Sequence, residues 1–119
     1  MIAVVFELEP AEGRADDYFD LAGKLRPLLE TIDGFISIER FESIAVPGRY
    51  LSLSFFETEA AVQAWRNMAE HRAAQSAGRA DILQNYRLRV ATVVRDYGKA
   101  ARAEAPPDSR LVHDPDTAG

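Results

Sequence analysis

Four segments of the chain have the hydrophobic pattern of β-strands. Residues 2–9 are mainly apolar and β-branched and run into a turn signal, which is typical of a strand. Residues 35–41 and 50–56 form two further runs of this kind. Because Pro47-Gly48 lies between them, we expect an antiparallel hairpin with a longer connection. From residue 86 to 96 apolar side chains alternate with arginines, which predicts a fourth strand.

Between the first and second strands, apolar residues recur at the spacing of one helix face. These residues are Tyr18, Leu21, Ala22, Leu25, Leu28, Leu29 and Ile32. Asp16 and Asp17 suit the start of this helix, because the helix dipole favours negative charge there. Pro27 should kink the helix or start a new turn, since it lacks a backbone donor. Asp33-Gly34 should end the helix.

A second helix is predicted before the last strand. Thr58 can cap it and Glu59 lies in its first turn. Its apolar stripe consists of Ala61, Val62, Trp65, Met68 and Ala69. Asn67 is a candidate interruption, so the segment up to Arg79 is read either as one helix or as two short helices.

The predicted order over residues 1–97 is β-α-β-β-α-β, the ferredoxin-like split βαβ arrangement of the α+β class. After Gly98 the composition changes to prolines, aspartates and small residues, which cannot build a core. Residues 98–119 are therefore expected to be a C-terminal tail that is disordered, or an arm that orders on a partner.

The strands are apolar on both faces, although two helices can cover only one face of the sheet. In the third strand Leu51, Leu53 and Phe55 point one way and Tyr50, Ser52, Ser54 and Phe56 the other. In the first strand Ile2, Val4 and Phe6 oppose Ala3 and Val5, and in the second Phe35 and Phe41 are separated from Ile36 and Ile38. Each side chain left uncovered forgoes about 1.5–3 kcal/mol of burial. We therefore expect a homodimer in which two sheets face each other.

Composition narrows the function classes. The 119 residues include no cysteine and two histidines, which excludes disulfides, thiolate metal sites and a histidine-rich metal site within one chain. A net charge of −5 gives no electrostatic reason to expect nucleic acid. The N-terminus lacks the basic start of a signal peptide, and no apolar run reaches the roughly 20 residues that cross a bilayer. These features predict a cytoplasmic domain with neither nucleic-acid nor membrane partners.

Candidate chemistry gathers on the second helix. Trp65 is either a core residue or the wall of a pocket between helix and sheet. His71 has the titration range of a general acid or base, although an exposed helical histidine is the simpler interpretation. Arg72 can neutralise an anionic oxygen or lie in solvent, and Gln75 can hydrogen-bond a ligand.

Three strand residues complete the candidate binding set. Ser52 and Ser54 share one strand face and can line a pocket, but no Gly-x-Ser-x-Gly motif surrounds them. Glu7 either faces the interior, where it needs a partner such as Arg40 or Arg89, or faces solvent. Neither a dinucleotide-binding glycine motif nor a P-loop is present, and no carboxylates have the spacing of a metal motif.

The chain resembles antibiotic biosynthesis monooxygenase domains over residues 1–97. The resemblance is carried by the IDGF turn at 32–35, the LSLSFF strand at 51–56, and AWRN at 64–67 followed by EHRAAQ at 70–75. It implies a dimeric α+β barrel, in which two sheets face each other and each protomer keeps a pocket between its sheet and its helices.

Family members that oxidise polycyclic phenols use neither metal nor flavin and carry a pocket tryptophan with a tyrosine six residues later. This chain is similar with Trp65 and, at the second place, His71, whereas the asparagine that those members carry before the tryptophan falls at Ala61. The haem-degrading branch uses a first-strand asparagine, a tryptophan and a histidine ligand, which correspond here to Glu7, Trp65 and Gln75.

The leading hypothesis is therefore a cofactor-independent monooxygenase of a small aromatic or quinol-like substrate. Trp65 and aromatic neighbours such as Phe56 would hold this substrate, and His71 would assist the reaction. The alternatives are a non-catalytic dimeric domain that binds a small ligand or acts in stress, and a haem-binding, haem-degrading monooxygenase.

Overall fold

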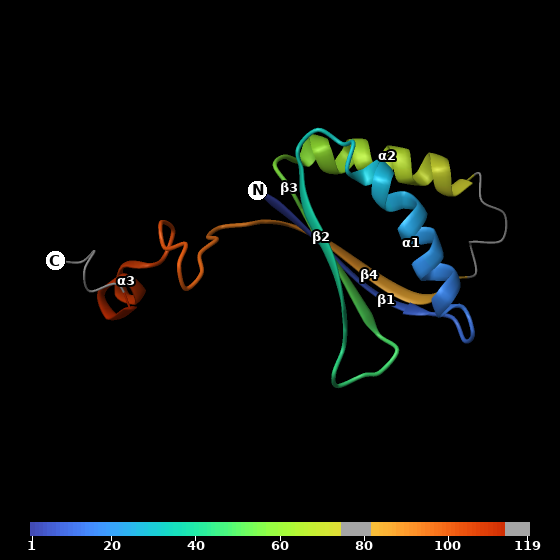
Figure 1. Cartoon of the computed structure of the whole chain (residues 1–119), viewed down its shortest axis with the longest axis horizontal. Coiled ribbons are helices and arrows are strands. Elements are labelled where there is room, and N and C mark those ends of the chain that lie inside the picture. Colours follow the sequence, from blue (N-terminus) through green and yellow to red (C-terminus); the bar gives the residue numbers. More distant parts are fainter. Residues whose placement is uncertain (75–81, 114–119) are drawn as a thin grey trace.

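The structure is a computed structural model that describes residues 1–74 and 82–113, without the side chains of residues 70–74. Its elements follow the predicted order, with one further short helix near the C-terminus (Figure 1). They are β1 (Ile2–Pro10), α1 (Ala15–Leu29), β2 (Phe35–Glu42), β3 (Tyr50–Phe56), α2 (Glu59–Ala74), β4 (Leu83–Thr92) and α3 (Pro107–His113).

The four strands form one antiparallel sheet in the order β2-β3-β1-β4. The hairpin of β2 and β3 supplies one edge, while β1 lies in the interior of the sheet between β3 and β4. Both α1 and α2 lie on the same side of the sheet (Figure 1). This is the ferredoxin-like α+β fold that the element order predicts, and it is confirmed.

Two hydrophobic clusters join the helices to the sheet. Leu8, Tyr18, Ala22 and Ile82 form one cluster, near the N-terminal half of α1. Leu29, Phe56 and Ala61 form the other, where the end of α1 meets the start of α2. Since Leu8, Leu29 and Phe56 are almost completely buried, these clusters anchor the two ends of the helical layer.

The prediction for the end of the first helix is wrong. The helix ends at Leu29, soon after Pro27, and the chain continues in tight turns such as Ile32 N–H to Leu29 C=O, 3.1 Å. Gly34 does adopt a positive φ of 91°, but it does so in the turn that leads into β2. Its left-handed conformation therefore starts a strand and does not cap a helix.

The second helix is capped as predicted, because Ala61 N–H donates to Thr58 Oγ1 at 3.2 Å. Asn67 does not interrupt it. The Asn67 side-chain oxygen accepts a hydrogen bond from Gln63 Nε2 one turn earlier, and α2 is continuous from Glu59 to Ala74. The predicted continuation up to Arg79 lies largely outside the described residues.

Two details of the strands differ from the predictions. The fourth strand is Leu83–Thr92 rather than 86–96, because Thr92 pairs with Ile2, the first residue of β1, and no partner residue of β1 lies beyond. In β2 the register shifts between Phe35 and Ser37. Phe35 therefore packs with Ile38 against the Phe56 cluster, not with Phe41 on the opposite face.

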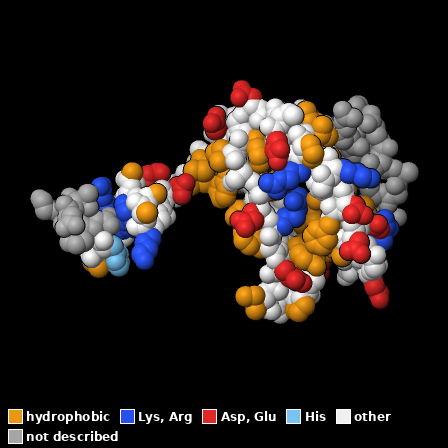
Figure 2. All heavy atoms as spheres, in the orientation of Figure 1, with side chains coloured by type: hydrophobic (Ala, Val, Ile, Leu, Met, Phe, Trp, Pro, Cys, Tyr) orange, Lys and Arg blue, Asp and Glu red, His pale blue; other side chains and the backbone are white. Residues whose placement is uncertain are grey.

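The C-terminal segment extends away from the sheet and the helices (Figures 1 and 2). Within it, the Arg102 guanidinium donates to Ser109 Oγ at 2.7 Å and lies over the Tyr97 ring. The short helix α3 has no buried residue. No helix of the described residues has both the length and the apolar composition that a membrane span requires.

Candidate functional site

A cavity of about 810 Å³ lies between the sheet and the two helices. Its volume is in the range of small-molecule sites. Most of its lining is apolar: Val4, Phe6, Leu21, Ala22, Leu25, Leu29, Ile38, Val62, Trp65, Ala69, Leu88 and Val90. Tyr18, Arg26, Arg40, Ser52, Ser54, Glu59, Gln63, Arg66 and Tyr86 complete the lining.

The strands make this cavity because their alternation places small side chains opposite the helices. Ser52 and Ser54 lie on the helix-facing side of β3, where they pair with Phe6 and Val4 of β1. Two serines fill less of the helix-to-sheet layer than the larger core residues that close it at either end. The cavity opens toward β4, whose Tyr86 and Leu88 line it and are 63% and 52% exposed.

Trp65 is half-buried in the wall of the cavity and also packs against the cluster around Phe56. Trp65 is thus both a core residue and part of the pocket wall, the two alternatives that the sequence left open, because its side chain both contacts the core and lines the cavity. An indole in this place offers a flat apolar surface and one N–H donor.

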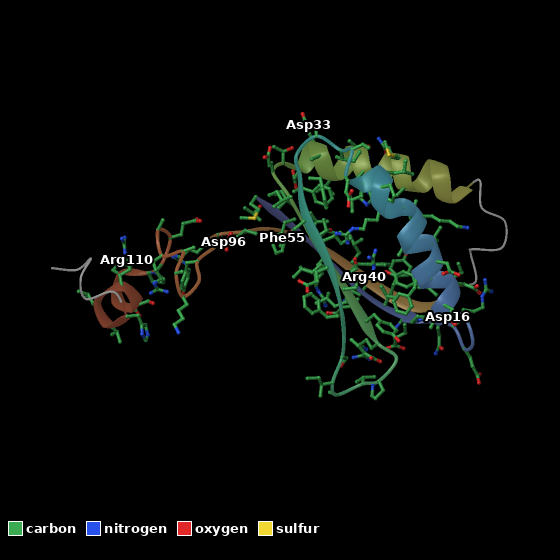
Figure 3. The ribbon with its side chains drawn as sticks, viewed as in Figure 1. Asp16, Asp33, Arg40, Phe55, Asp96 and Arg110 are labelled. Carbon is green, nitrogen blue, oxygen red and sulfur yellow. The ribbon has the colours of Figure 1, made fainter. Side chains whose placement is uncertain are left out.

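Arg40 supplies a positive charge to the cavity. It projects from β2 toward α1 (Figure 3), and its Nε donates to the Tyr18 hydroxyl at 3.3 Å. Its guanidinium carbon lies 5.9 Å from the centre of the Tyr18 ring, so the phenol holds the arginine by a cation–π contact as well. Among the side chains that the structure describes, no carboxylate forms an ion pair with Arg40.

Ser52 and Ser54 add hydroxyl groups beside this charge. Arg40 is the cross-strand partner of Ser52, and Ile38 is that of Ser54. Both serines are 7% exposed, yet their hydroxyls have no hydrogen-bond partner among the described residues. The sheet side of the cavity therefore carries a guanidinium and two hydroxyls without partners among the described residues, and α1 adds the Tyr18 phenol beside them.

Two predicted binding residues do not line the cavity. Glu7 lies on the opposite face of the sheet, where its carboxylate accepts a hydrogen bond from Arg89 at 3.2 Å. The interior location considered for Glu7 is wrong, because Glu7 and Phe6 point to opposite faces. Phe56 is completely buried in the core and contacts Phe35 edge-to-face.

The remaining predicted residues cannot be placed. Gln75 and the side chains of His71 and Arg72 lie outside the described residues. Sequence reasoning, for its part, did not place Arg40 and Tyr18 in the site. The signal for Arg40 was present in the alternation of β2, since Arg40 and Ile38 are two residues apart and must share a face.

The described side chains do not form an evident metal site. Across the part of the chain that the structure describes, no three His, Cys, Asp or Glu side chains lie close enough together to hold a metal ion. The site that can be built from these residues is a largely apolar cavity that also carries three arginines, one glutamate and several hydroxyl-bearing side chains. Figure 2 shows hydrophobic and basic side chains side by side on one face of the sheet-and-helix part of the molecule.

The sequence is similar to those of known proteins. A family model described as antibiotic biosynthesis monooxygenase matches residues 1–77. The jasmonate monooxygenase ABM of Pyricularia oryzae is 45% identical over 93 residues, which are 78% of this chain and 43% of that protein. This chain therefore spans less than half the length of that relative.

Solved structures share the fold at low sequence identity. Rv0793 from Mycobacterium tuberculosis has a TM-score of 0.68 at 16% identity, with 82% of this chain and 98% of that chain covered. A variant of MhuD that holds two manganese protoporphyrin IX molecules per active site has a TM-score of 0.65 at 22% identity, with 82% and 99% covered. From the family match over residues 1–77 and the shared fold, we conclude that this chain belongs to the antibiotic biosynthesis monooxygenase family.

Proposed function

We propose that this domain is a cofactor-independent monooxygenase that acts on a small aromatic or quinol-like molecule. The observation that carries the proposal is the cavity of about 810 Å³ with Trp65 in its wall, in a chain of this family. The jasmonate monooxygenase relative supports oxygen chemistry on a small organic molecule.

The reaction balances without a further reductant when the substrate is an electron-rich phenol. One atom of O₂ enters the ring as a carbonyl oxygen and the other leaves as water. The ring C–H and the phenol O–H bonds that break supply the four electrons, so a phenol becomes a quinone. The protein would orient the ring against Trp65 and the apolar wall of the cavity, which is the positioning that such a reaction needs.

His71 is proposed to accept or donate the proton, as the sequence suggests. His71→Ala should then lower turnover far more than it lowers the free energy of unfolding. A variant that loses both in equal proportion would show that the histidine is only structural.

Haem is a poorer fit to the described lining. The usual axial ligands are histidine, cysteine, methionine and tyrosine. Of these, only tyrosine is present among the described lining residues: the Tyr18 hydroxyl is already bonded to Arg40, and Tyr86 lies 63% exposed on β4. The sequence also carries glutamine at position 75, where the haem-degrading branch has its histidine.

Dimerisation is part of the proposal. Domains of this family are commonly dimeric. The face of the sheet away from the helices carries Val5, Leu53 and Phe55, with Phe41 43% exposed nearby (Figure 3 shows Phe55). An apolar sheet face of this kind marks an interface, and the same face of a second copy complements it about a two-fold axis.

We propose that the C-terminal segment then packs on this second copy. Val94, Leu111 and Val112 are 77%, 67% and 72% exposed within one chain. They lie in or next to a segment that reaches away from its own sheet (Figure 1). Packing on a partner would bury them.

Oxygen uptake tests the enzymatic proposal. A panel of phenols and quinols is added to the full chain in an oxygen electrode, with and without a two-electron reductant such as NADH. Wild-type protein should consume oxygen with a phenol alone. Trp65→Ala should lower kcat/KM by tenfold or more, whereas Ile44→Ala, at a side chain that is 99% exposed, should change nothing.

Two results would reject the proposal. One is uptake only when the reductant is present, which would show that the substrate does not supply the electrons. The other is ligand binding, detected by Trp65 fluorescence, without oxygen uptake under any condition. That result would favour a non-catalytic binding domain.

A further inference from the structure

We infer that Arg40 makes this cavity a site for a carboxylate, so that the substrate is a mainly apolar ring compound that carries one carboxylate group. The inference rests on the proposed function of the cavity as a substrate site. It concerns which molecules enter the cavity and does not depend on whether they react there.

Arg40 carries a positive charge that is only partly exposed to solvent. A guanidinium is always ionised, and partial burial beside apolar walls removes some of its hydration. Tyr18 engages only Nε, so both Nη groups of Arg40 lack a hydrogen-bond partner among the described residues. An anion in the cavity would satisfy these donors and offset the lost hydration.

Tyr18 fixes the orientation of the Arg40 guanidinium. The cation–π contact and the hydrogen bond with Tyr18 hold the guanidinium in place, which reduces the entropy that binding would otherwise cost. A fixed planar guanidinium with two free Nη groups suits the two oxygens of a carboxylate. The Ser52 hydroxyl, on the strand position paired with Arg40, can donate a further hydrogen bond.

The other arginines of the lining already have interaction partners. Arg26 pairs with Glu30, and Arg66 also has an interaction partner. Glu59 is the one carboxylate among the described lining residues, and it forms no ion pair with Arg40. Arg40 is thus the cation of this lining that is best placed to bind an anion, and the surrounding apolar residues would hold the rest of the molecule.

The test compares acids with their neutral methyl esters, because each pair differs mainly in charge. The probes are 1-naphthoate with methyl 1-naphthoate, and jasmonate with methyl jasmonate. The quenching of Trp65 fluorescence reports binding to the full chain, since Trp65 is the only tryptophan and lines the cavity. Wild-type protein should bind at least one acid more tightly than its ester.

Arg40→Gln should weaken binding of that acid by about 10- to 100-fold, and binding of its ester by less than about threefold. Arg40→Lys keeps the charge but not the planar fork, so its loss should be intermediate. Arg49→Gln is the matched control, because Arg49 lies in the same hairpin and pairs with Glu9 away from the cavity. It should leave both affinities unchanged.

The inference is overturned if wild-type protein binds neither acid, or if acid and ester lose affinity equally in Arg40→Gln. Circular dichroism of each variant shows whether it is folded. If Arg40→Gln does not fold, the affinities of Arg40→Lys for the acid and the ester are compared with those of wild type instead. Acid binding without oxygen uptake would leave this inference standing while rejecting the monooxygenase. Oxygen uptake with neutral phenols, without a preference for acids, would support the monooxygenase and reject the carboxylate site.

Discussion

Replacing Gly34 by alanine should destabilise the fold, because the turn before β2 has room for no side chain. Gly34 has a φ of 91°, in the region that L-residues rarely adopt. A Cβ added there would lie 3.0 Å from the Cβ of Ala61, which is 4% exposed and belongs to the core. The turn thus holds the start of α2 against the start of β2, next to the cavity.

The magnitude follows from these two observations. A left-handed conformation costs a non-glycine residue about 1–2 kcal/mol. Forcing an extra methyl group into a packed contact adds about 1 kcal/mol or more, because the turn or the buried Ala61 would have to shift to relieve the 3.0 Å approach. We therefore expect Gly34→Ala to lower the free energy of unfolding by about 2–3 kcal/mol, a large part of the roughly 5–15 kcal/mol of a typical domain.

Gly23→Ala is the matched control and should have the opposite sign. Gly23 lies inside α1, and nothing is within 4 Å of the position its Cβ would take. Alanine is favoured over glycine in a helix by about 0.5–1 kcal/mol. The same chemical change should therefore stabilise the protein at one glycine and destabilise it at the other.

Urea unfolding of the two variants, followed by Trp65 fluorescence and by circular dichroism, measures this difference. The free energies of unfolding of the two variants should differ by about 2.5–4 kcal/mol; in thermal unfolding, at about 4 °C per kcal/mol, their midpoints should differ by about 10–16 °C. Equal stability of Gly34→Ala and wild type would refute the turn geometry. If Gly23→Ala lost more unfolding free energy than Gly34→Ala, the packing described for both glycines would be wrong.

Two further predictions concern the core and the open sheet face. Phe56→Ala should cost about 3–5 kcal/mol of unfolding free energy in urea denaturation, because Phe56 is completely buried and contacts Phe35, whereas the exposed Ile44→Ala should change it by less than about 0.5 kcal/mol. A loss below about 1 kcal/mol for Phe56→Ala would contradict its place in the core. Leu53→Asp should convert a dimer into a monomer in sedimentation experiments at micromolar concentration, since it puts a charge on the proposed interface, and Ile44→Asp should not. A wild-type monomer, or an intact Leu53→Asp dimer, would reject that interface.

Much of the fold followed from local patterns in the sequence. Alternation placed Ser52 and Ser54 together on one face of a strand, and the structure puts that face against the helices. The boundaries were less predictable, because they depend on partners. β4 ends at Thr92 since β1 begins at Ile2, and no pattern within residues 86–96 contains that information.

The site was less accessible from the sequence than the fold. Trp65 stood out because it is the only tryptophan, but its neighbours in space come from distant segments. Tyr18 and Arg40 are 22 residues apart and meet only because α1 packs over the sheet. Glu7 had two candidate partners, and the pairing of β1 with β4 selected Arg89.

The sequence by itself determined the order of strands and helices, the two-sided apolar character of the sheet and the family, because each of these is written in short-range spacing and in matching residues. Only the tertiary structure decided which side chains share the cavity. That outcome depends on strand register, on the shift between Phe35 and Ser37, and on how closely the helices approach two small serines. These are properties of segments packed together, and no single segment contains them.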